Sequence, residues 1–506
     1  NQSTAWSGLD RTLVRWGHMN AREPAGFAFM VSRDTADSLR ARLKAGEKIV
    51  LHAQVKATVG PGHWTVVTGT IPGSDANAGE IVYSCHLDHE RPGANDNGSG
   101  CVTILESARI LARLVSTGAI PKPLRTLRFI WGPEVEGTMA YLASHPEVKK
   151  ELRADIHMDM VGGDPFKNKS IFHVTATPWS LPSFVTDVGE AFLNVIKAGA
   201  SNYAASGADK DAAVIEDRNG APGTRNEFIA DVTPYSAGSD HDDYDSSTIA
   251  VPSLYLRDWP DIYIHTDHDT LQQIDPTKLR RVALLGAALG YAMATMDRER
   301  MQSSMPILAA DAQESLVEDF KRAQLWVNNP NSSPEAAWYE ARNLMTQSAR
   351  LETLTIGSAA QLTGGDMSVA TLSQQFDKVL DTQARARGVK SLSPSAPWAN
   401  DPAAKRIPIR IAEFGPLTYQ NDDVLAARLG RERVSKIKLL SSSVTPMLSA
   451  EDLPELYAYE IVNFVNGERS VGEIRDAVSA EFGPISVDVV ADYLDACVEA
   501  KIIAWK

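Results

Sequence analysis

The side chains of this chain that could do chemistry are imidazoles and carboxylates that follow short apolar runs. His86 and Asp88 come directly after an apolar run that is typical of a buried strand. Further acids and imidazoles stand in four later segments, at 92–100, 131–137, 157–162 and 263–270. Zinc accepts imidazole nitrogen and carboxylate oxygen, and a site with few protein ligands leaves room for an activated water. These residue types therefore indicate a catalytic zinc site.

The elements that would position these segments alternate between strands and helices from about residue 79 to residue 296. Strands are predicted at 80–85, 126–131, 155–160, 171–176 and 251–257, and helices at 99–115, 181–196 and 276–296. This alternation is typical of an α/β sheet covered by helices. Ligands bind outside the carboxyl ends of the strands in such sheets, so the separate segments can converge there. In the first helix, the three- and four-residue spacing predicts that one stripe faces the sheet, made of Val102, Leu105, Ala108, Leu111 and Leu114.

Each segment has an ordinary interpretation when it is taken alone. A single histidine at a strand end is more often a hydrogen-bonded core residue, and an acidic pair there is more often a solvated rim. An Asn-Asp-Asn-Gly turn, as at 95–98, usually caps a helix. The order and spacing of the segments together are much more specific than any one of them.

This ordered set of motifs resembles the co-catalytic zinc aminopeptidase family, which also includes glutamate carboxypeptidase-like enzymes. The motifs are His86-x-Asp88, Gly93-Ala94-Asn95-Asp96-Asn97-Gly98-Ser99-Gly100, the glutamates at 134 and 136, Met158-Asp159-Met160-Val161-Gly162, Ser239-Asp240-His241 and His265-Thr266 with Asp269-Thr270. The resemblance covers residues 76–300 and implies the zinc exopeptidase fold, a mixed and mostly parallel sheet between helices. Residues 1–75 resemble the end of a protease-associated insert or lid.

The resemblance implies a set of metal ligands for two zinc ions, namely His86, Asp96, Glu134, Asp159 and His265. Asp96 would be the carboxylate that bridges the two ions. Asp88 would accept a hydrogen bond from the second ring nitrogen of His86, as the partners of metal-bound imidazoles commonly do.

The chain departs from the family pattern at Glu134-Val135-Glu136, where relatives have two adjacent glutamates. Without a gap, Glu134 takes the position of the general base, and Val135, which cannot bind zinc, takes the position of the ligand. A short deletion instead makes Glu134 the ligand and Glu136 the nearest base. We favour the second alignment because it keeps a complete ligand set. Ile264 also stands where several relatives have a tyrosine that stabilises an oxyanion, so Tyr244 or Arg257 is expected to serve.

The activity implied by the resemblance is that of a zinc-dependent exopeptidase acting through a metal-bound hydroxide with a glutamate general base. The acids of the site would attract a substrate α-ammonium group, and only Arg225 and Arg257 are basic beside the motifs. This balance favours an aminopeptidase that acts on peptides. One alternative is a mononuclear zinc glutaminyl cyclase-like transferase, and another is a non-catalytic binding protein on the same fold.

The remainder of the chain predicts three further regions. Residues 301–390 are expected to form a helical extension, 391–415 a proline-containing linker, and 416–506 a winged-helix-like domain. Residues 451–506 contain 12 acidic and 4 basic residues, a balance that would repel phosphates. We therefore expect this domain to support homo-oligomer contacts and not to bind duplex DNA.

Composition limits the remaining possibilities. The 506 residues carry a net charge of −14, the wrong sign for a nucleic acid or an anionic membrane as the main partner. No apolar run approaches the roughly 20 residues that cross a bilayer. Three cysteines do not provide a disulfide framework. The compartment stays open, with a secreted or periplasmic location favoured over a cytoplasmic one.

Overall fold

The structure is a computed structural model that describes residues 10–17, 28–56, 58, 60–89, 92–206, 224, 226–360, 370–392, 396–411, 421–441 and 453–506. Its centre is a seven-stranded sheet with the order β1-β3-β2-β4-β7-β5-β6. The strands are β1 (Val67–Ile71), β2 (Glu80–His86), β3 (Thr126–Gly132), β4 (Leu152–Asp159), β5 (Ile171–Thr175), β6 (Ala230–Thr233) and β7 (Ser253–Trp259). Two pairs, β1 with β3 and β5 with β7, are antiparallel, and the other four pairs are parallel. The predicted α/β class with a mixed, mostly parallel sheet is confirmed.

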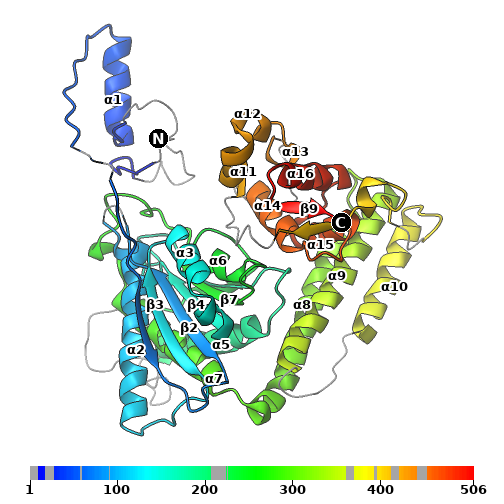
Figure 1. Ribbon diagram of the computed structural model, residues 1–506, viewed down its shortest axis with the longest axis horizontal. Coiled ribbons are helices and arrows are strands. Elements are labelled where there is room, and N and C mark those ends of the chain that lie inside the picture. The colour runs from blue at the N-terminus through cyan, green and yellow to red at the C-terminus, as the bar shows by residue number, and fades with distance from the viewer. Residues whose placement is uncertain are drawn as a thin grey trace.

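Helices cover both faces of this sheet (Figure 1). They are the π-type turn η1 (Ala94–Ser99), α2 (Gly100–Ser116), α3 (Glu136–Ser144), α4 (Pro146–Glu151), α5 (Val185–Ser206), α6 (His241–Asp245) and α7 (Pro276–Thr295). In β2, Tyr83 joins one core with residues of α2, α5 and α7, while Val82 joins another with Leu142 of α3 and Tyr244 of α6. Because successive strand residues face opposite sides, a strand buried on both faces carries apolar side chains toward both cores.

The buried face of α2 differs from the predicted stripe. Cys101, Ile104 and Leu111 are buried, whereas Val102 and Leu105 are 52% and 59% exposed. The helix turns small residues toward its neighbour α7, and the Ser107 hydroxyl reaches the carbonyl of Ala283 at 3.4 Å. The close approach of α2 to α7 therefore sets the rotation of α2. The spacing of the large apolar residues does not encode this approach.

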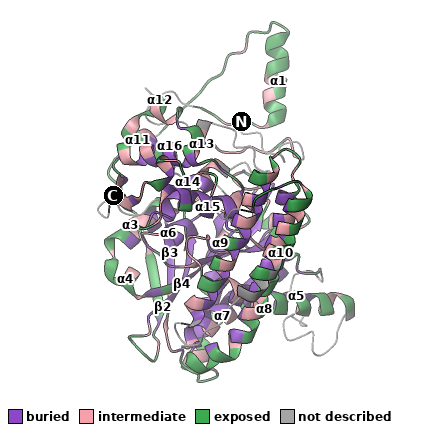
Figure 2. Cartoon of the chain, turned by 90° about the vertical axis from the view of Figure 1, so that its right-hand side faces the viewer, coloured by how far each residue is buried: buried purple, intermediate pink, exposed green. Residues whose placement is uncertain are grey.

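The first described helix, α1 (Arg33–Lys44), has no buried residue and lies away from the sheet (Figure 1). Ser32 caps this helix, because its hydroxyl accepts the Thr35 N–H. The described residues of 49–55 form no strand, although apolar and polar residues alternate there. Figure 2 shows the contrast between the exposed α1 and the buried strands of the sheet.

Three helices follow the α/β domain: α8 (Arg298–Val327), α9 (Pro334–Ala360) and α10 (Ala370–Ala386). The C-terminal region contains η4 (Ala403–Lys405), α11 (Asn421–Leu429), α12 (Arg431–Val434), α13 (Lys438–Ser441), α14 (Leu453–Asn463), α15 (Val471–Phe482) and α16 (Val487–Glu499), with strands β8 (Pro408–Arg410) and β9 (Ile503–Trp505). Since β8 pairs antiparallel with β9, part of the predicted linker is a strand of the C-terminal domain. Its winged-helix likeness stays a prediction.

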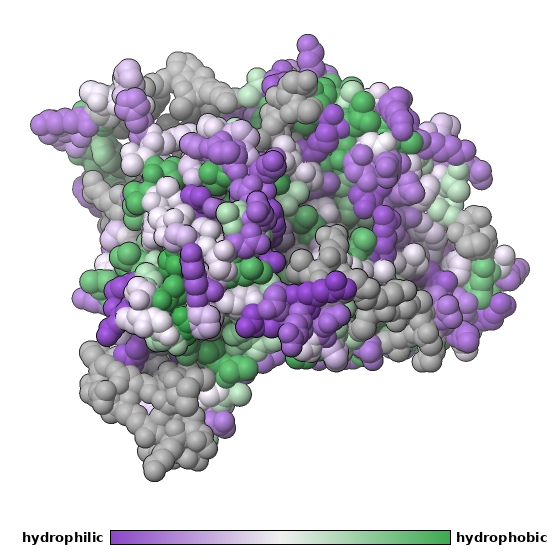
Figure 3. All heavy atoms as spheres, turned by 60° about the horizontal axis from the view of Figure 1, so that its bottom comes forward, coloured by the Kyte–Doolittle hydropathy of each residue, from purple (hydrophilic) through white to green (hydrophobic). Residues whose placement is uncertain are grey.

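The C-terminal domain packs against both other regions. The Tyr459 hydroxyl donates to the carbonyl of Asp242 at 2.6 Å, and the Tyr339 hydroxyl of α9 donates to Asp476 Oδ2 at 2.6 Å. On the face shown in Figure 3, hydrophobic side chains form small areas separated by hydrophilic ones. Within the described part of the chain, no helix combines the length and apolar character needed to span a membrane.

Candidate metal centre

The turn between β2 and α2 is held by its own motif residues. The Asp269 carboxylate accepts the backbone N–H groups of Asn95 at 2.8 Å and Asp96 at 2.9 Å. Asn95 Oδ1 accepts the Gly162 N–H at 2.9 Å. At Gly100, a Cβ would lie only 2.1 Å from the Met158 carbonyl oxygen, so only glycine allows this approach to the end of β4. Asn95 and Asp269 thus fix the backbone of the turn and leave the Asp96 side chain to face the site.

Asp96 has the geometry of a bridging carboxylate. Its Oδ1 lies 3.3 Å from His86 Nε2, while its Oδ2 lies 3.3 Å from His89 Nε2 and 3.1 Å from His265 Nε2. On the His86 side, Asp159 Oδ1 is also 3.3 Å from His86 Nε2. Each oxygen of Asp96 therefore faces its own set of imidazole and carboxylate atoms.

Two groups of side chains could each hold one ion. The first is His86, Glu134 and Asp159, and the second is His89, Asp96 and His265, with the ligand atoms of each group within 4.8 Å of one another. All five ligands implied by the resemblance are thus brought together from strand ends that span 180 residues. The strands β2 and β4 and the turn η1 supply His86, Asp159 and Asp96.

His89 is the member of these groups that the sequence interpretation did not include. It lies three residues beyond His86, within the same motif, in the loop after β2. The sequence contained only an indirect signal for His89. A ligand position of the ungapped alignment holds Val135, and an additional histidine stands in the first motif.

Asp88 does not play the role predicted for its carboxylate. The second ring nitrogen of His86, Nδ1, lies 3.0 Å from the backbone carbonyl of Asp88, and the carboxylate Oδ1 is 3.9 Å away. That Oδ1 instead accepts the backbone N–H of Glu134 at 2.9 Å. Asp88 therefore orients the His86 ring through its backbone carbonyl, while its carboxylate holds the backbone N–H of Glu134.

The two glutamates of the triplet lie in different surroundings. Glu134 belongs to the first group, beside His86 and Asp159. Glu136 begins α3, is exposed and is in neither group. Between them, Val135 has a positive φ of 50° and donates its N–H to Asp240 Oδ1 at 2.5 Å. This turn of the backbone separates two side chains that an extended strand would point the same way.

The surroundings shift the pKa values of two acids of the site, Asp96 and Glu134, in opposite directions. Burial alone would raise the pKa of Asp96, but the three surrounding imidazoles lower that pKa well below its ordinary value. Burial raises the pKa of Glu134 to about 8, and although His86 opposes this shift, the neighbouring Asp159 and Asp240 carboxylates add to it. Asp96 is thus held as an anion, whereas Glu134 is poised to carry a proton.

Metal ions fit this donor set. His86 Nε2, both ring nitrogens of His89 and Asp159 Oδ1 are buried and form no hydrogen bond with any described residue. Buried polar atoms are nearly always partnered, so several adjacent exceptions indicate that these atoms serve another ligand. Three imidazoles converging with carboxylates are residue types that catalytic zinc sites use.

Of the residues expected to replace the family's tyrosine, only Arg257 is near the site. Tyr244 is fully buried in the opposite core, with Val82 and Leu142. Arg257 pairs in register with Asp159 across β4 and β7, and its guanidinium lies over the Tyr255 ring at 5.2 Å. Arg225 lies outside the described residues. Tyr255 itself reaches Asp159, with its hydroxyl 3.5 Å from Oδ2.

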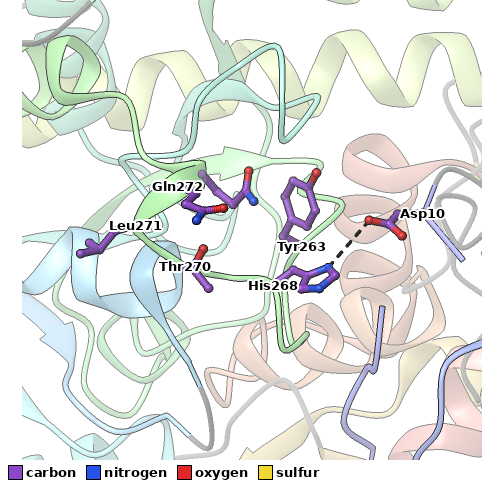
Figure 4. Close-up of a pocket in the computed structure, with 7 residues that line it drawn as sticks. Asp10, Tyr263, His268, Thr270, Leu271 and Gln272 are labelled. Atoms are coloured by element: carbon purple, nitrogen blue, oxygen red, sulfur yellow. Dashed lines mark ion pairs between the residues drawn. The ribbon is translucent and has the colours of Figure 1, made fainter. Parts of the chain in front are cut away.

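A cavity of about 550 Å³ lies beside the loop that carries His265. It is lined by Tyr263, His268, Thr270, Leu271, Gln272, Gln273 and, from the N-terminal segment, Asp10. Figure 4 shows Asp10 facing His268, with 3.7 Å between Oδ2 and Nδ1. The N-terminal segment is tied to the same loop, because Trp16 donates its backbone N–H to the His265 carbonyl at 3.0 Å.

An α/β domain with two groups of metal-ligand side chains at the carboxyl ends of its strands is the architecture of a metal-dependent hydrolase. Residues 66–289 match the family model described as "Peptidase family M28". This match agrees with the family resemblance expected from the motifs, over these residues. The match supports the zinc metallopeptidase class that the resemblance implied.

The curated relatives match a smaller part of the chain. An "Aminopeptidase" of Pseudomonas aeruginosa (strain UCBPP-PA14) is 35% identical over 114 residues, which cover 21% of this chain and 19% of that protein. A "Leucine aminopeptidase 1" of Phaeosphaeria nodorum is 30% identical over 127 residues, covering 22% and 31%. The chain thus spans between about a fifth and a third of the length of these two relatives.

Two solved peptidase structures are similar to this chain at low TM-scores. The zinc aminopeptidase BSAP from Bacillus subtilis has a TM-score of 0.34 and 20% identity, covering 46% of this chain and 50% of its own. A putative peptidase from Clostridium acetobutylicum has a TM-score of 0.38 and 11% identity, covering 98% of this chain and 71% of its own.

Proposed function

We propose that this protein is a zinc-dependent exopeptidase that removes residues from the N-terminus of peptides. The observation that carries the proposal is Asp96, whose two oxygens face separate groups of metal-ligand side chains. Zinc held there would polarise the peptide carbonyl and lower the pKa of a water molecule. With two groups available, we propose that two ions bind.

We propose Glu134 as the residue that moves the proton. His86, Asp96 and Asp159 can hold the first ion without it, so its carboxylate is free to take a proton from water and to deliver it to the leaving amine. Asp88 fixes the backbone of Glu134 beside the site. Glu136, which the favoured alignment made the base, is exposed at the start of α3 and has no part in this proposal.

The charges around the site support an aminopeptidase over a carboxypeptidase. Glu134 and Asp159 would attract the α-ammonium group of a peptide, and the Ser239 hydroxyl keeps Asp159 in place by donating to Oδ2 at 2.8 Å. Arg257 is the cation nearest to Asp159 in the register of β4 and β7. Its guanidinium is stacked between the Tyr255 and Trp259 rings, where it can stabilise charge that develops on a substrate oxygen.

The test compares matched peptides on the full chain loaded with zinc. We expect hydrolysis of peptides with a free N-terminus, loss of hydrolysis when that N-terminus is acetylated, and loss of activity in a chelator with recovery on adding zinc. A peptide beginning with glutamine should lose its first residue. Cyclisation of that glutamine with release of ammonia would instead favour a cyclase, and equal cleavage of blocked peptides at their C-terminus would favour a carboxypeptidase.

A further inference from the structure

The second metal position, at Asp96 Oδ2 and His265, contains no residue of the Glu134-Val135-Glu136 triplet. Residue 135, at the ligand position of the ungapped alignment, is valine. Its side chain is buried and apolar, and its backbone N–H is committed to Asp240. Without another donor, this position would keep only Asp96 Oδ2 and His265. Two protein ligands are fewer than the three that catalytic zinc sites have.

We infer that His89 is the missing ligand, so that the second position consists of two imidazoles and the shared carboxylate. This inference deepens the proposed function, since it concerns the metal centre on which that function rests. His89 Nε2 is 3.3 Å from Asp96 Oδ2, on the same oxygen that His265 approaches. The imidazole therefore reaches the second position from a different part of the chain than the triplet.

The polar contacts of His89 point the same way. Only 12% of its side chain is exposed, and apart from the 3.3 Å approach of Nε2 to Asp96 neither ring nitrogen has a hydrogen-bond partner among the described residues. A neutral imidazole carries one donor and one acceptor, and a buried histidine of ordinary structural role uses at least one of them. An imidazole whose unpartnered nitrogen faces a carboxylate and a second imidazole is arranged as a metal ligand.

The surroundings hold the His89 ring in this place. A Cβ on Gly93 would lie 2.8 Å from the Cγ atom of His89, so the ring needs a glycine at residue 93. The Trp16 ring meets His89 edge-on at 6.2 Å and lies 4.0 Å from the His265 ring. One aromatic side chain thus contacts both imidazoles of the second position.

The exchange of a carboxylate for an imidazole changes the chemistry of the position. Two imidazoles and one carboxylate, with an open fourth place, are the ligand set of several catalytic zinc sites. A neutral ligand in place of an anion leaves more positive charge on the ion, and nitrogen ligands favour zinc, cobalt, nickel or copper over magnesium and manganese.

The test counts metal ions in the full chain. After chelation and reloading with Zn²⁺ or Co²⁺, metal analysis should give two ions in the wild type and one in His89→Ala and His89→Gln. A Co²⁺ titration followed by visible absorption should show two phases in the wild type. In both variants the second phase should be absent or should need at least about tenfold more Co²⁺, since losing even an outer partner of a ligand weakens metal affinity by that factor. His268→Gln, which changes a histidine beside Asp10 in the neighbouring cavity (Figure 4), should keep both ions.

The glutamine variant keeps the size of the side chain and so guards against a folding defect, which circular dichroism and thermal unfolding would report. Two ions bound with wild-type affinity in folded His89→Gln would overturn the inference. So would a wild type that binds one ion and keeps it in both variants. The metal counts do not depend on peptide hydrolysis, so the loss of one ion in a protein that cleaves no peptide would uphold His89 and refute the proposed function alone.

Discussion

Two buried aspartates of the same domain, Asp96 and Asp242, show opposite solutions to burying a carboxyl group. Each is less than 5% exposed. Asp96 is surrounded by three imidazoles, which lower its pKa well below the ordinary value despite burial. Asp242 in α6 is contacted by the Tyr235 hydroxyl and the Gly238 N–H, and burial raises its pKa to about 7. The partners, and not the depth, decide which carboxyl group is held as an anion.

The two aspartates accordingly differ in role, since Asp96 is placed to bind a cation and Asp242 connects two regions of the structure. The anion of Asp96 faces unpartnered ring nitrogens and is suited to a cation. Asp242 lies under the C-terminal domain, where its own carbonyl accepts the Tyr459 hydroxyl, and it joins the two regions. Glu134 stands between these cases, since it is partly buried with a pKa raised to about 8 yet lies beside His86 in the candidate metal centre.

The largest effect is expected for Asp96→Asn. The amide keeps the shape of the side chain but removes the charge that faces both groups. Metal retention should fall at both positions, and kcat/KM should fall roughly 10⁴-fold or more, because the metal contributes several kcal/mol to transition-state stabilisation. Metal analysis and peptide hydrolysis measure the two effects. Retention of both ions with near wild-type turnover would show that Asp96 bridges nothing.

Glu134→Gln should retain both ions and reduce kcat by about 10²- to 10⁴-fold, the usual contribution of general acid–base catalysis. The matched change Glu136→Gln, two residues away on the exposed start of α3, should alter kcat by less than about threefold on the same reasoning. If Glu134→Gln loses a metal ion and Glu136→Gln loses turnover, the roles are those of the alignment favoured from the sequence.

Asp88→Ala compares the two roles of Asp88, one through its backbone carbonyl and the other through its carboxylate. Its backbone carbonyl, which holds His86, is unchanged by the substitution, whereas the acceptor for the Glu134 N–H is lost. We expect both ions to stay bound and kcat to fall about 10- to 100-fold, as for other partners that orient active-site groups. Loss of the first ion in this variant would restore the ring-orienting role predicted for the carboxylate.

The smallest effect concerns stability at Asp242. Its folded pKa of about 7 lies above the ordinary value of 3.8, so the unfolded chain gives up this proton at lower pH than the folded one. This group therefore stabilises less as pH rises from about 4 to 7, by about 1.4 kcal/mol for each pKa unit. In metal-free protein, Asp242→Asn should gain stability relative to wild type between pH 5 and 8 in urea unfolding. An unchanged difference across that range would mean that Asp242 is ionised in the fold.

The sequence predicted the central strands of the sheet well because they are buried. β2 and β4 are almost entirely buried, and their short segments of apolar residues between turn signals are visible without a structure. The rotation of α2 was not predictable in this way, since it depends on the approach of α7 to Ser107. The strand pairing of Pro408–Arg410 with Ile503–Trp505 also joins residues that are distant in sequence.

The site was predictable where ligands stand at strand ends, and less so in its loops. His86, Asp96, Asp159 and His265 converge as expected, because parallel strands end at one edge of the sheet. His89 and the separation of Glu134 from Glu136 depend on loop backbone, including the positive φ of Val135. Spacing along the chain does not encode such turns.

The measurement that tests the account most directly is anomalous diffraction at the zinc absorption edge from crystals of the zinc-loaded full chain. We expect two peaks, one bonded to His86, Asp96 and Asp159 and the other to His89, Asp96 and His265, with bonds near about 2.0 to 2.2 Å. One peak alone, or a second peak from which His89 is absent, would contradict the account.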